Sequence, residues 1–353
     1  MEDVVNRARL WPQRRVLVTG QTGFKGAWLA LWLDRLGARV SGLALPPQTQ
    51  PNLHDLLELS GRIDDAYGDI RDPAAVDAAF VRSRPEVVFH LAAQALVRAS
   101  YAEPVETFAT NVMGTVHVLE AARKHHVPVV VVVTSDKCYE QGGVPHRFRE
   151  GDPLGGHDPY SASKAAAEIV AASYRRSYLS TDTILATVRA GNVIGGGDWS
   201  PDRIVTDVVA AVRTQTPIRL RYPHSVRPWQ HVADALDGYL RVAERGLLGD
   251  TSVARAWNFA PLEPGSLTVE ELAIALRREL HSDVPIVVES TVEPHETAVL
   301  TLDASDAAKY LGWTPRRDAA AAIAATGAWY REFFRGTPAT ELVEADLESR
   351  APA

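Results

Sequence analysis

Short apolar runs alternate with helical patterns through the first half of the chain. The clearest run is Val129 to Val133, five consecutive valines, which predicts a strand buried on both faces of a parallel sheet. Comparable runs predict strands at 14–19, 38–45 and 183–189 and a strand with its following loop at 86–94, and the segment 68–72 predicts the end of another strand. Helical patterns that are typical of crossover connections lie between them, at 27–36, 105–125 and 161–178.

The alternation becomes irregular after residue 190, where a glycine-rich loop follows the last of these strands. The predicted fold is therefore α/β: a Rossmann-type doubly wound parallel sheet with a smaller C-terminal mixed α/β substrate lobe. We expect a dinucleotide-binding domain at 12–190 with 226–262 returning to it, a substrate-binding lobe at 191–225 and 263–336, and a flexible tail at 337–353.

Composition narrows the class of protein. The chain has 353 residues, a net charge of -7 and one cysteine, Cys138. No basic excess indicates nucleic acid or an anionic membrane as a partner, and no apolar run approaches the ~20 residues of a membrane helix. A single cysteine excludes an intrachain disulfide and a multi-cysteine metal site, and no metal is expected. Residues 1–12 are charged and lack the apolar core of a signal peptide, so we expect a cytoplasmic protein.

A glycine-rich turn stands between the first predicted strand and the first helix. Gly20 permits a tight turn, and Gly23 lets the backbone approach a pyrophosphate whose charge the helix N-terminus favours. The alternative is a tight turn without a ligand. Most of the candidate cofactor contacts lie in this turn and after the next strands. The full set is Gly20, Thr22, Gly23, Phe24, Lys25, Gly26, Asp69, Ile70, Leu91, Ala92, Ala93, Gln94, Asn111, Tyr160 and Lys164.

Two of these contacts have an equally simple structural interpretation. Asp69 is placed to accept a hydrogen bond from an adenine amine, or to cap the helix that starts near Pro73. Asn111 can be an ordinary polar helix residue. The end of the second strand carries neither an acidic nor a basic residue before Pro46, so the pattern does not decide between NAD and NADP.

Tyr160 and Lys164 are four residues apart, which places both on one face of a helix. An ammonium beside a phenol lowers the pKa of the phenol. Such a tyrosine can take a proton from a sugar hydroxyl while hydride leaves the same carbon, and Thr134 can donate a hydrogen bond to the same oxygen. The alternative is a surface tyrosine near a surface lysine.

Arginines and aromatic residues come together at 219–223 and 226–232. Guanidinium groups suit a diphosphate, and aromatic faces suit a base or sugar. The alternative is a proline-bounded surface loop. The candidate substrate contacts are Asn192, Arg203, Arg221, Arg227, Gln230 and His295.

These motifs together resemble the extended short-chain dehydrogenase/reductase family, over roughly 14–315. Within it they are similar to the nucleotide-sugar dehydratases that act on CDP-glucose. The most specific motif is the Asp136-Lys137 pair. Relatives that act on dTDP-glucose carry aspartate-glutamate at these two positions, and simple epimerases carry neither pair. The segments that carry the resemblance are 19–26 with Trp28, 134–139, 152–156, 189–199 and 227–232.

The resemblance implies an NAD-dependent 4,6-dehydratase that converts CDP-glucose to CDP-4-keto-6-deoxyglucose. Tyr160 would deprotonate the C4 hydroxyl as hydride passes to NAD, and Asp136 would protonate the departing C6 hydroxyl. Hydride then returns to C6. Lys137 stands where relatives have a carboxylate base, and it acts either as a neutral base or as a charged stabiliser of the enolate. Thr134 and Lys164 complete the implied catalytic set.

Several alternatives stay open. Departures from the family pattern at His157, Thr206, Asp234 and Ala260 keep another nucleotide sugar or a nucleoside as the substrate. An epimerase or a ketoreductase on the same scaffold is a second alternative, and a non-catalytic NAD-binding protein is a third. The two helical stretches at 105–125 and 161–178 suit either the interior of one subunit or the interface of a homodimer or dimer of dimers, and the sequence does not separate these.

Overall fold

The centre of the molecule is a six-stranded parallel sheet. A computed structural model describes residues 7–142, 146–179, 183–261, 266–289 and 300–348. The spatial order of the strands is β2 (Arg39–Leu43), β1 (Arg15–Thr19), β3 (Val87–His90), β4 (Val129–Val133), β6 (Ile184–Ala190) and β11 (Ala256–Phe259). The predicted α/β doubly wound sheet is confirmed.

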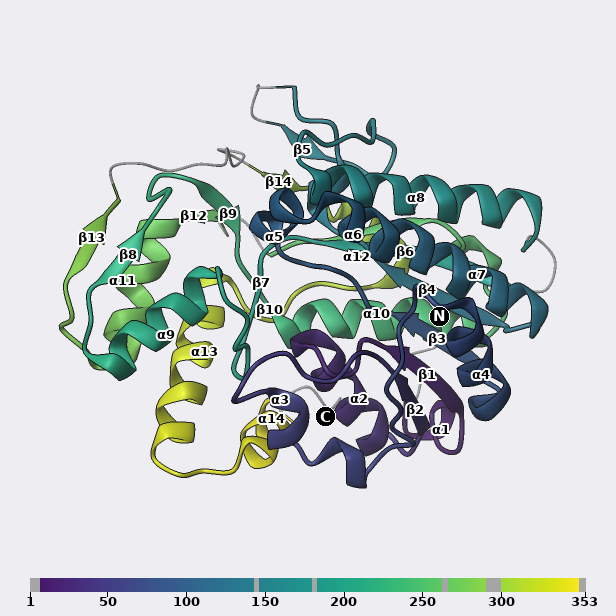
Figure 1. Cartoon of the computed structure of the whole chain (residues 1–353), viewed down its shortest axis with the longest axis horizontal. Coiled ribbons are helices and arrows are strands. Elements are labelled where there is room, and N and C mark those ends of the chain that lie inside the picture. Colours follow the sequence, from purple (N-terminus) through teal and green to yellow (C-terminus); the bar gives the residue numbers. More distant parts are fainter. Residues whose placement is uncertain (1–6, 143–145, 180–182, 262–265, 290–299, 349–353) are drawn as a thin grey trace.

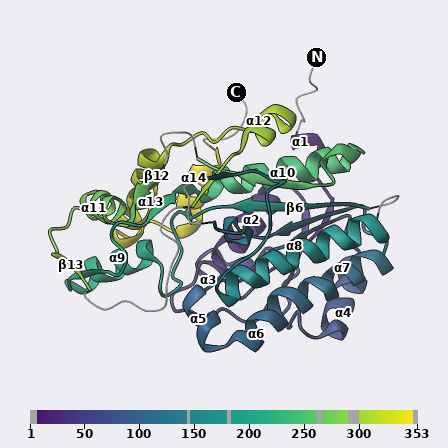
Figure 2. The ribbon, with the colours of Figure 1, turned by 90° about the horizontal axis from the view of Figure 1, so that it is seen from above.

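The valine run of β4 explains why the sheet is covered on both sides. Val129, Val131 and Val133 pack into one apolar core, while Val130 and Val132 pack into the other, because successive side chains of a strand point to opposite faces. Figure 2 shows β6 between α10 on one side and α7 and α8 on the other. The first face is covered by α2 (Phe24–Arg35) and α10 (Val232–Leu247), the second by α4 (Pro73–Ser83), α7 (Gly114–Lys124) and α8 (Pro159–Ser177).

The chain changes direction across the sheet at β1. It passes from β1 to its neighbour β2 on one side and later returns to β3 on the other side. The loops that follow β1 and β3 therefore meet at the carboxyl edge of the sheet, where open α/β sheets bind ligands.

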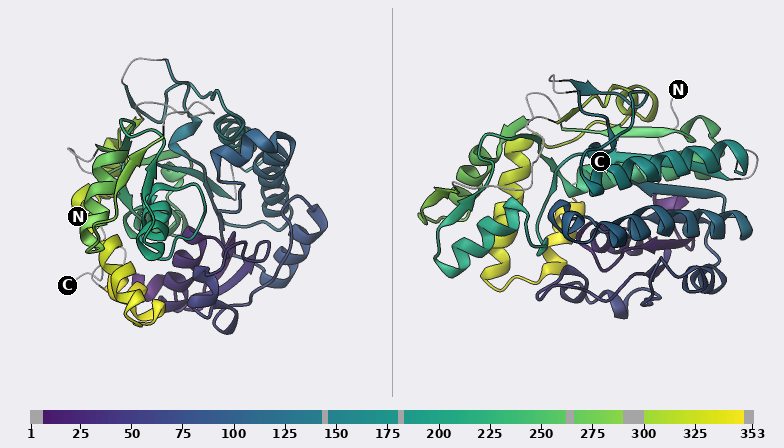
Figure 3. Two further views of the ribbon diagram at one scale, coloured as in Figure 1. Left: turned by 60° about the vertical axis from the view of Figure 1, so that its left-hand side comes forward. Right: turned by 45° about the horizontal axis from the view of Figure 1, so that its top comes forward.

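A group of the remaining elements extends the fold beyond one end of the sheet, where α9, α11, β8 and β13 gather (Figures 1 and 3). Small two-stranded sheets pair β8 (Ile218–Leu220) with β13 (Ile286–Val288), β9 (Val226–Pro228) with β12 (Ser266–Thr268), β7 (Val193–Ile194) with β10 (Gln230–His231) and β5 (Arg147–Phe148) with β14 (Thr301–Leu302). The other helices are α1 (Arg7–Leu10), α3 (Leu53–Leu56), α5 (Val97–Ala102), α6 (Pro104–Phe108), α9 (Ile204–Thr214), α11 (Val269–Glu279), α12 (Ser305–Leu311), α13 (Ala319–Phe334) and α14 (Ala339–Glu348).

Two local predictions were wrong. The segment 68–72 is no strand: the chain before it touches β2 only through isolated bridges at Asp64 and Tyr67. Its carboxylates bind locally instead, since Asp69 pairs with Arg71 and Asp72 caps α4. The predicted helix at 105–125 is interrupted by a π-helical turn, Ala109–Met113, between α6 and α7.

The tail also differs from the prediction, because residues 339–348 form helix α14 instead of a flexible end. Ala339, Val343 and Leu347 recur every four residues and are buried on one face of that helix. The helix packs against α13, α2 and α3, and an ion pair of 3.1 Å joins Arg35 to Glu344.

No helix within the described ranges is long and apolar enough to span a bilayer. The division of the chain into two domains stays a prediction.

Candidate active site

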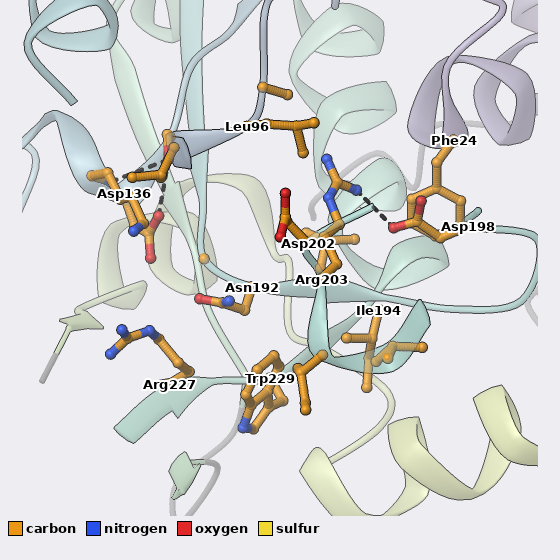
Figure 4. A pocket seen from close by; sticks show the side chains of 18 of the residues that line it. Phe24, Leu96, Asp136, Asn192, Ile194, Asp198, Asp202, Arg203, Arg227 and Trp229 are labelled. Carbon is orange, nitrogen blue, oxygen red and sulfur yellow. Dashed lines mark hydrogen bonds and ion pairs between the residues drawn. The ribbon is translucent and has the colours of Figure 1, made fainter. Parts of the chain in front are cut away.

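A cleft of about 280 Å³ opens where the strands of the central sheet end. Its wall contains residues from the loops that follow β1, β3, β4 and β6, together with residues of α9 and β9. Figure 4 shows Asp136, Asn192 and Arg227 on one side of this cleft and Phe24, Asp198 and Arg203 on the other.

The glycine-rich turn lies between the end of β1 and the start of α2, at the same edge of the sheet as the cleft. Gly20 has a φ of +83°, and a Cβ there would lie 2.7 Å from the backbone nitrogen of Ala92. A Cβ at Gly26 would lie 2.0 Å from the carbonyl oxygen of Gly20. Gly23 caps α2 without a side-chain hydrogen bond, so the first N–H groups of this helix are free of a side-chain cap. Such a turn fits a pyrophosphate at a helix N-terminus.

An uncharged histidine, His90, links β1 to helix α7 beside the glycine-rich turn. The hydroxyl of Thr115 donates to the carbonyl of Asn111 at 2.7 Å, so it accepts from Nε2 of His90 at 3.1 Å. Nδ1 of His90 then accepts from the Thr19 hydroxyl at 2.7 Å, and Thr19 Oγ1 accepts from the Ala92 N–H. Burial lowers the pKa of His90 to about 3, so the ring stays uncharged at neutral pH.

Two predicted cofactor contacts are engaged by the protein itself. The Asn111 side chain accepts from the Gln94 N–H at 2.8 Å and donates to Gln94 O at 2.9 Å and Ser163 Oγ at 2.8 Å. Asn111 therefore ties the loop after β3 to helix α8. The carboxylate of Asp69 is held by the guanidinium of Arg71, which lowers the pKa of that carboxyl.

The remaining predicted cofactor contacts lie around the turn and the loop after β3. Thr22 donates its hydroxyl proton to Leu45 O at 2.9 Å, and Ile70 is buried against Gly114. Leu91 N–H donates to Thr19 O at 3.0 Å, which sets the start of the loop that contains Ala92 and Ala93. Phe24 and Lys25 line the cleft directly.

Tyr160 and Lys164 lie on the first turns of α8, which Asp158 caps. Lys164 Nζ donates to the carbonyl of Val133 at 3.2 Å. The expected lowering of the phenol pKa was wrong for the protein alone: burial raises the pKa of Tyr160 to about 12 and outweighs the groups that act against it. Burial also lowers the pKa of Lys164 to about 8.

The hydroxyl next to Tyr160 belongs to Ser135, which the sequence reasoning missed. Thr134 also lines the cleft, but its hydroxyl donates its proton to the buried carboxylate of Glu168. Ser135 lines the cleft with Tyr160, and it is among the groups that lower the pKa of the phenol against the larger effect of burial. Adjacent residues at the end of a strand face opposite sides, so this alternation was the available signal.

Beneath the cleft, Glu168 and Arg189 form a buried ion pair. Arg189 Nη2 lies 2.7 Å from Glu168 Oε2, and each residue is 3% exposed. Thr187 and Thr134 also donate to the carboxylate, and Arg189 donates to the Tyr139 hydroxyl at 2.7 Å. These bonds lower the pKa of Glu168, so the pair stays charged and holds the ends of β4 and β6 together.

Asp136 is a buried acid at the cleft. Its Oδ1 accepts from Ser135 Oγ at 3.0 Å, and its Oδ2 has no hydrogen-bond partner within the described part of the chain. Burial raises the pKa of Asp136, which favours a carboxyl that keeps its proton until a stronger acceptor arrives.

Two lysines share the cleft with Asp136. Lys137 follows it on a 3₁₀ turn, Asp136–Cys138, and is half-buried in the wall of the cleft. Lys25 enters from the start of α2, and burial together with the charges of Lys164 and Arg203 lowers its pKa to about 7.

The predicted substrate contacts divide into three groups. Asn192, Arg203, Arg221 and Arg227 line the cleft, where Arg203 pairs with Asp198 at 2.7 Å, as Figure 4 shows. Gln230 lies outside the lining: it is fully buried, and neither polar atom of its amide has a partner within the described ranges. His295 lies outside the described residues.

Comparison with known sequences finds relatives that match most of the chain. The family model for GDP-mannose 4,6 dehydratase matches residues 17–326. A CDP-glucose 4,6-dehydratase of Salmonella typhimurium is 41% identical over 333 residues, 92% of this chain and 93% of the relative. A dTDP-glucose 4,6-dehydratase of Mycolicibacterium smegmatis is 30% identical over 344 residues, 95% of this chain and 99% of the relative.

Solved structures show the same fold. A UDP-glucose 4-epimerase from Thermotoga maritima superposes with a TM-score of 0.80 at 22% identity, over 90% of this chain and 99% of that one. A dTDP-glucose 4,6-dehydratase from Streptomyces venezuelae, solved with NAD bound, gives a TM-score of 0.77 at 26% identity, over 90% of this chain and 97% of that one. The family match and the curated relatives both extend over most of the chain, and on that evidence the protein belongs to the GDP-mannose 4,6 dehydratase family.

Proposed function

We propose that the protein is an NAD-dependent 4,6-dehydratase of CDP-glucose. The observation that carries the proposal is that a buried acid, Asp136, and a buried phenol, Tyr160, line the same cleft. An epimerase needs no acid for a departing hydroxyl, whereas a dehydratase does. The choice of CDP-glucose rests on the 41% identical relative of that name.

Each residue then has a chemical task. The glycine-rich turn would hold NAD, which would supply the acceptor and donor for the hydride. Tyr160 takes the proton of the C4 hydroxyl, and Lys164 lies one helical turn further along α8. Asp136 gives its proton to the C6 hydroxyl, which leaves as water. The low exposure of both groups keeps bulk water away from the 4-keto sugar.

Arginines would hold the nucleotide. Arg203, Arg221 and Arg227 line the cleft, with Arg227 on the side of Asp136 and Arg203 on the side of Asp198, and guanidinium groups bind diphosphate oxygens in pairs. Arg221 bridges Asp202 at 2.6 Å and Asp207 at 3.1 Å, and these carboxylates fix the guanidinium in place. Asn192 lies beside them at the end of β6.

The direct test is product mass. Purified protein with NAD and CDP-glucose is expected to yield a sugar nucleotide that has lost one water, with no net reduction of NAD. UDP-glucose and dTDP-glucose serve as matched controls, because they change only the base. A product of unchanged mass would point to an epimerase, and stoichiometric reduction of NAD would point to a dehydrogenase; either result would contradict the proposal.

Lys137 is proposed to assist removal of the C5 proton, as base or as stabiliser of the enolate. In the Lys137→Met protein we expect dehydration to fall by about 100-fold or more, while C4 oxidation continues and reduced nicotinamide accumulates. Absorbance of the reduced nicotinamide and product mass give the two rates separately. Lys124→Met, at an exposed position on α7, is the control. Dehydration at the parental rate would remove Lys137 from the mechanism.

We also propose a homodimer formed by the exposed face of α6, the following π turn and α8. Val105 is 81% exposed, Ile169 58% and Met113 47%, and α6 packs beside α8. Apolar side chains in such a group mark protein interfaces. Light scattering of the parent protein is expected to give twice the mass of one chain. The Ile169→Asp protein is expected to have the mass of a single chain. Ile274→Asp on α11, where the side chain is 46% exposed, is expected to leave the mass unchanged.

A further inference from the structure

The exposed part of the cleft wall differs from the catalytic part. Asp136 and Tyr160 are buried, whereas the side chains of Arg98 and Asp202 in the same wall are 44% and 39% exposed. A nucleotide sugar carries its sugar and its base at opposite ends of a diphosphate. A substrate whose glucose reaches the buried groups therefore directs its base toward the exposed part of the wall.

Four charged side chains in this exposed part form a cluster, the Arg221 cluster, and they are Arg98, Asp202, Asp207 and Arg221. Arg221 Nη1 donates to Asp202 Oδ1 at 2.6 Å, and Arg221 Nη2 donates to Asp207 Oδ2 at 3.1 Å. Arg98, on α5, donates to the same oxygen of Asp202 at 3.4 Å. The φ of Asp202 is +60°, in the left-handed region that residues other than glycine rarely adopt, and its carboxylate bridges the two guanidinium groups.

The formal charges of the Arg221 cluster cancel, because it contains two guanidinium groups and two carboxylates. A diphosphate is anionic, and it is bound best by guanidinium groups whose charge is not already offset. The cluster instead presents N–H donors beside carboxylate acceptors, which suits an uncharged ring that has donors and acceptors on one edge. Tyr222 follows Arg221 in the wall and supplies an aromatic side chain that can contact such a ring. A nucleobase has these properties.

Asp207 is the carboxylate of the cluster that gains most from a further donor. It lies in the first turn of α9 and lines the cleft, and its Oδ1 makes no hydrogen bond with any other described residue. Asp202 has two arginine partners, which hold the pKa of its carboxyl below the usual value against the effect of burial. Burial raises the pKa of Asp207, and the ion pair with Arg221 offsets only part of this effect.

We propose that Asp207 selects cytosine as the base of the nucleotide-sugar substrate. Oδ1 of Asp207 accepts a hydrogen bond from the exocyclic amine at C4 of cytosine. Uracil and thymine carry a carbonyl oxygen at that carbon, which a carboxylate repels. Arg221 holds the carboxylate in place through Oδ2. This role rests on the proposed function, since it requires a nucleotide sugar in the cleft.

The test measures the binding of CDP and UDP, which differ only in the base and need no chemistry to bind. By isothermal titration calorimetry of the NAD-bound protein, the parent is expected to bind CDP more tightly than UDP by about 10- to 100-fold. In the Asp207→Asn protein an amide of the same shape offers N–H donors as well as an acceptor, so CDP is expected to bind more weakly and UDP more tightly. The ratio of the two dissociation constants is expected to fall to about 3 or less.

The matched control is Asp306→Asn on α12. The Asp306 side chain has a similar exposure, 36%, and pairs with Arg255 at 3.0 Å, but it is not part of the cleft wall. The ratio for this variant is expected to equal that of the parent. Should Asp207→Asn fail to fold, Asp207→Ala removes the carboxylate without adding a donor, and it is expected to weaken the binding of CDP but not that of UDP.

Two results would overturn the role of Asp207: a parent protein that binds CDP and UDP equally, or Asp207 variants that keep the parental ratio. Failure of the proposed function gives a different pattern. A parent that prefers CDP, loses this preference in Asp207→Asn and yet removes no water from CDP-glucose would support the role of Asp207 and contradict the dehydratase.

Discussion

The Tyr160→Phe protein is expected to bind NAD and CDP-glucose and to oxidise C4 at a rate lower by about 100- to 10,000-fold. The phenol is the group that takes the C4 proton, and phenylalanine keeps the ring that fills the buried pocket but removes the acceptor oxygen. Neither reduced nicotinamide nor dehydrated product should accumulate. The stopped-flow absorbance of reduced nicotinamide measures the oxidation step directly.

The matched control for this substitution is Tyr178→Phe, which removes a phenol oxygen from a residue that is 61% exposed at the end of α8. Its oxidation rate is expected to equal the parental rate. The contrast with Lys137→Met is diagnostic, because that variant should still oxidise C4 whereas Tyr160→Phe should not. Oxidation by Tyr160→Phe at the parental rate would show that another base takes the C4 proton.

Replacing Arg189 by methionine is expected to reduce the free energy of unfolding by about 3–5 kcal/mol, because it leaves Glu168 buried and unpaired. Urea titration of the variant and the parent measures the difference. The matched control is Arg149→Met, since Arg149 pairs with Asp303 at 3.0 Å but its side chain is 72% exposed. There we expect a loss of about 1 kcal/mol or less.

A second variant identifies the cause of the Arg189 effect. In the Arg189→Met, Glu168→Leu double variant the unpaired charge is gone, so the free energy of unfolding is expected to recover part of the loss. A loss in Arg189→Met no greater than in Arg149→Met would mean that the buried pair contributes little to stability.

The elements of the sheet were predictable because each depends on a local pattern. The valine run at 129–133 is buried on both faces of the sheet, and the glycine spacing at 20–26 produces a turn that larger side chains would block. These signals need no knowledge of the rest of the chain. The tail at 339–348 carries such a pattern too, since Ala339, Val343 and Leu347 are four apart, but acidic residues lie between them and are equally typical of a flexible end.

The candidate site was less predictable, because its properties depend on packing between distant segments. Thr134 and Ser135 are adjacent hydroxyl residues, and only the position of Glu168 decides which of the two hydroxyls it binds. Whether the pKa of Tyr160 rises or falls depends on whether the effect of burial is larger than that of the groups around the phenol. Gln230 carries the residue type of a substrate contact but lies buried behind the lining.

Helix α14 packs against helices that are far apart in the sequence. It rests on α2, whose first turn begins at the cofactor end of the cleft, and also on α13, which packs on α11. A motion that separated α2 from α13 would break the packing of α14 on one of these helices. It would expose Val343 or Leu347 to water, at a free-energy cost of about 1.5–3 kcal/mol for each side chain. The C-terminal end of the chain therefore limits how far the two sides of the molecule can swing apart.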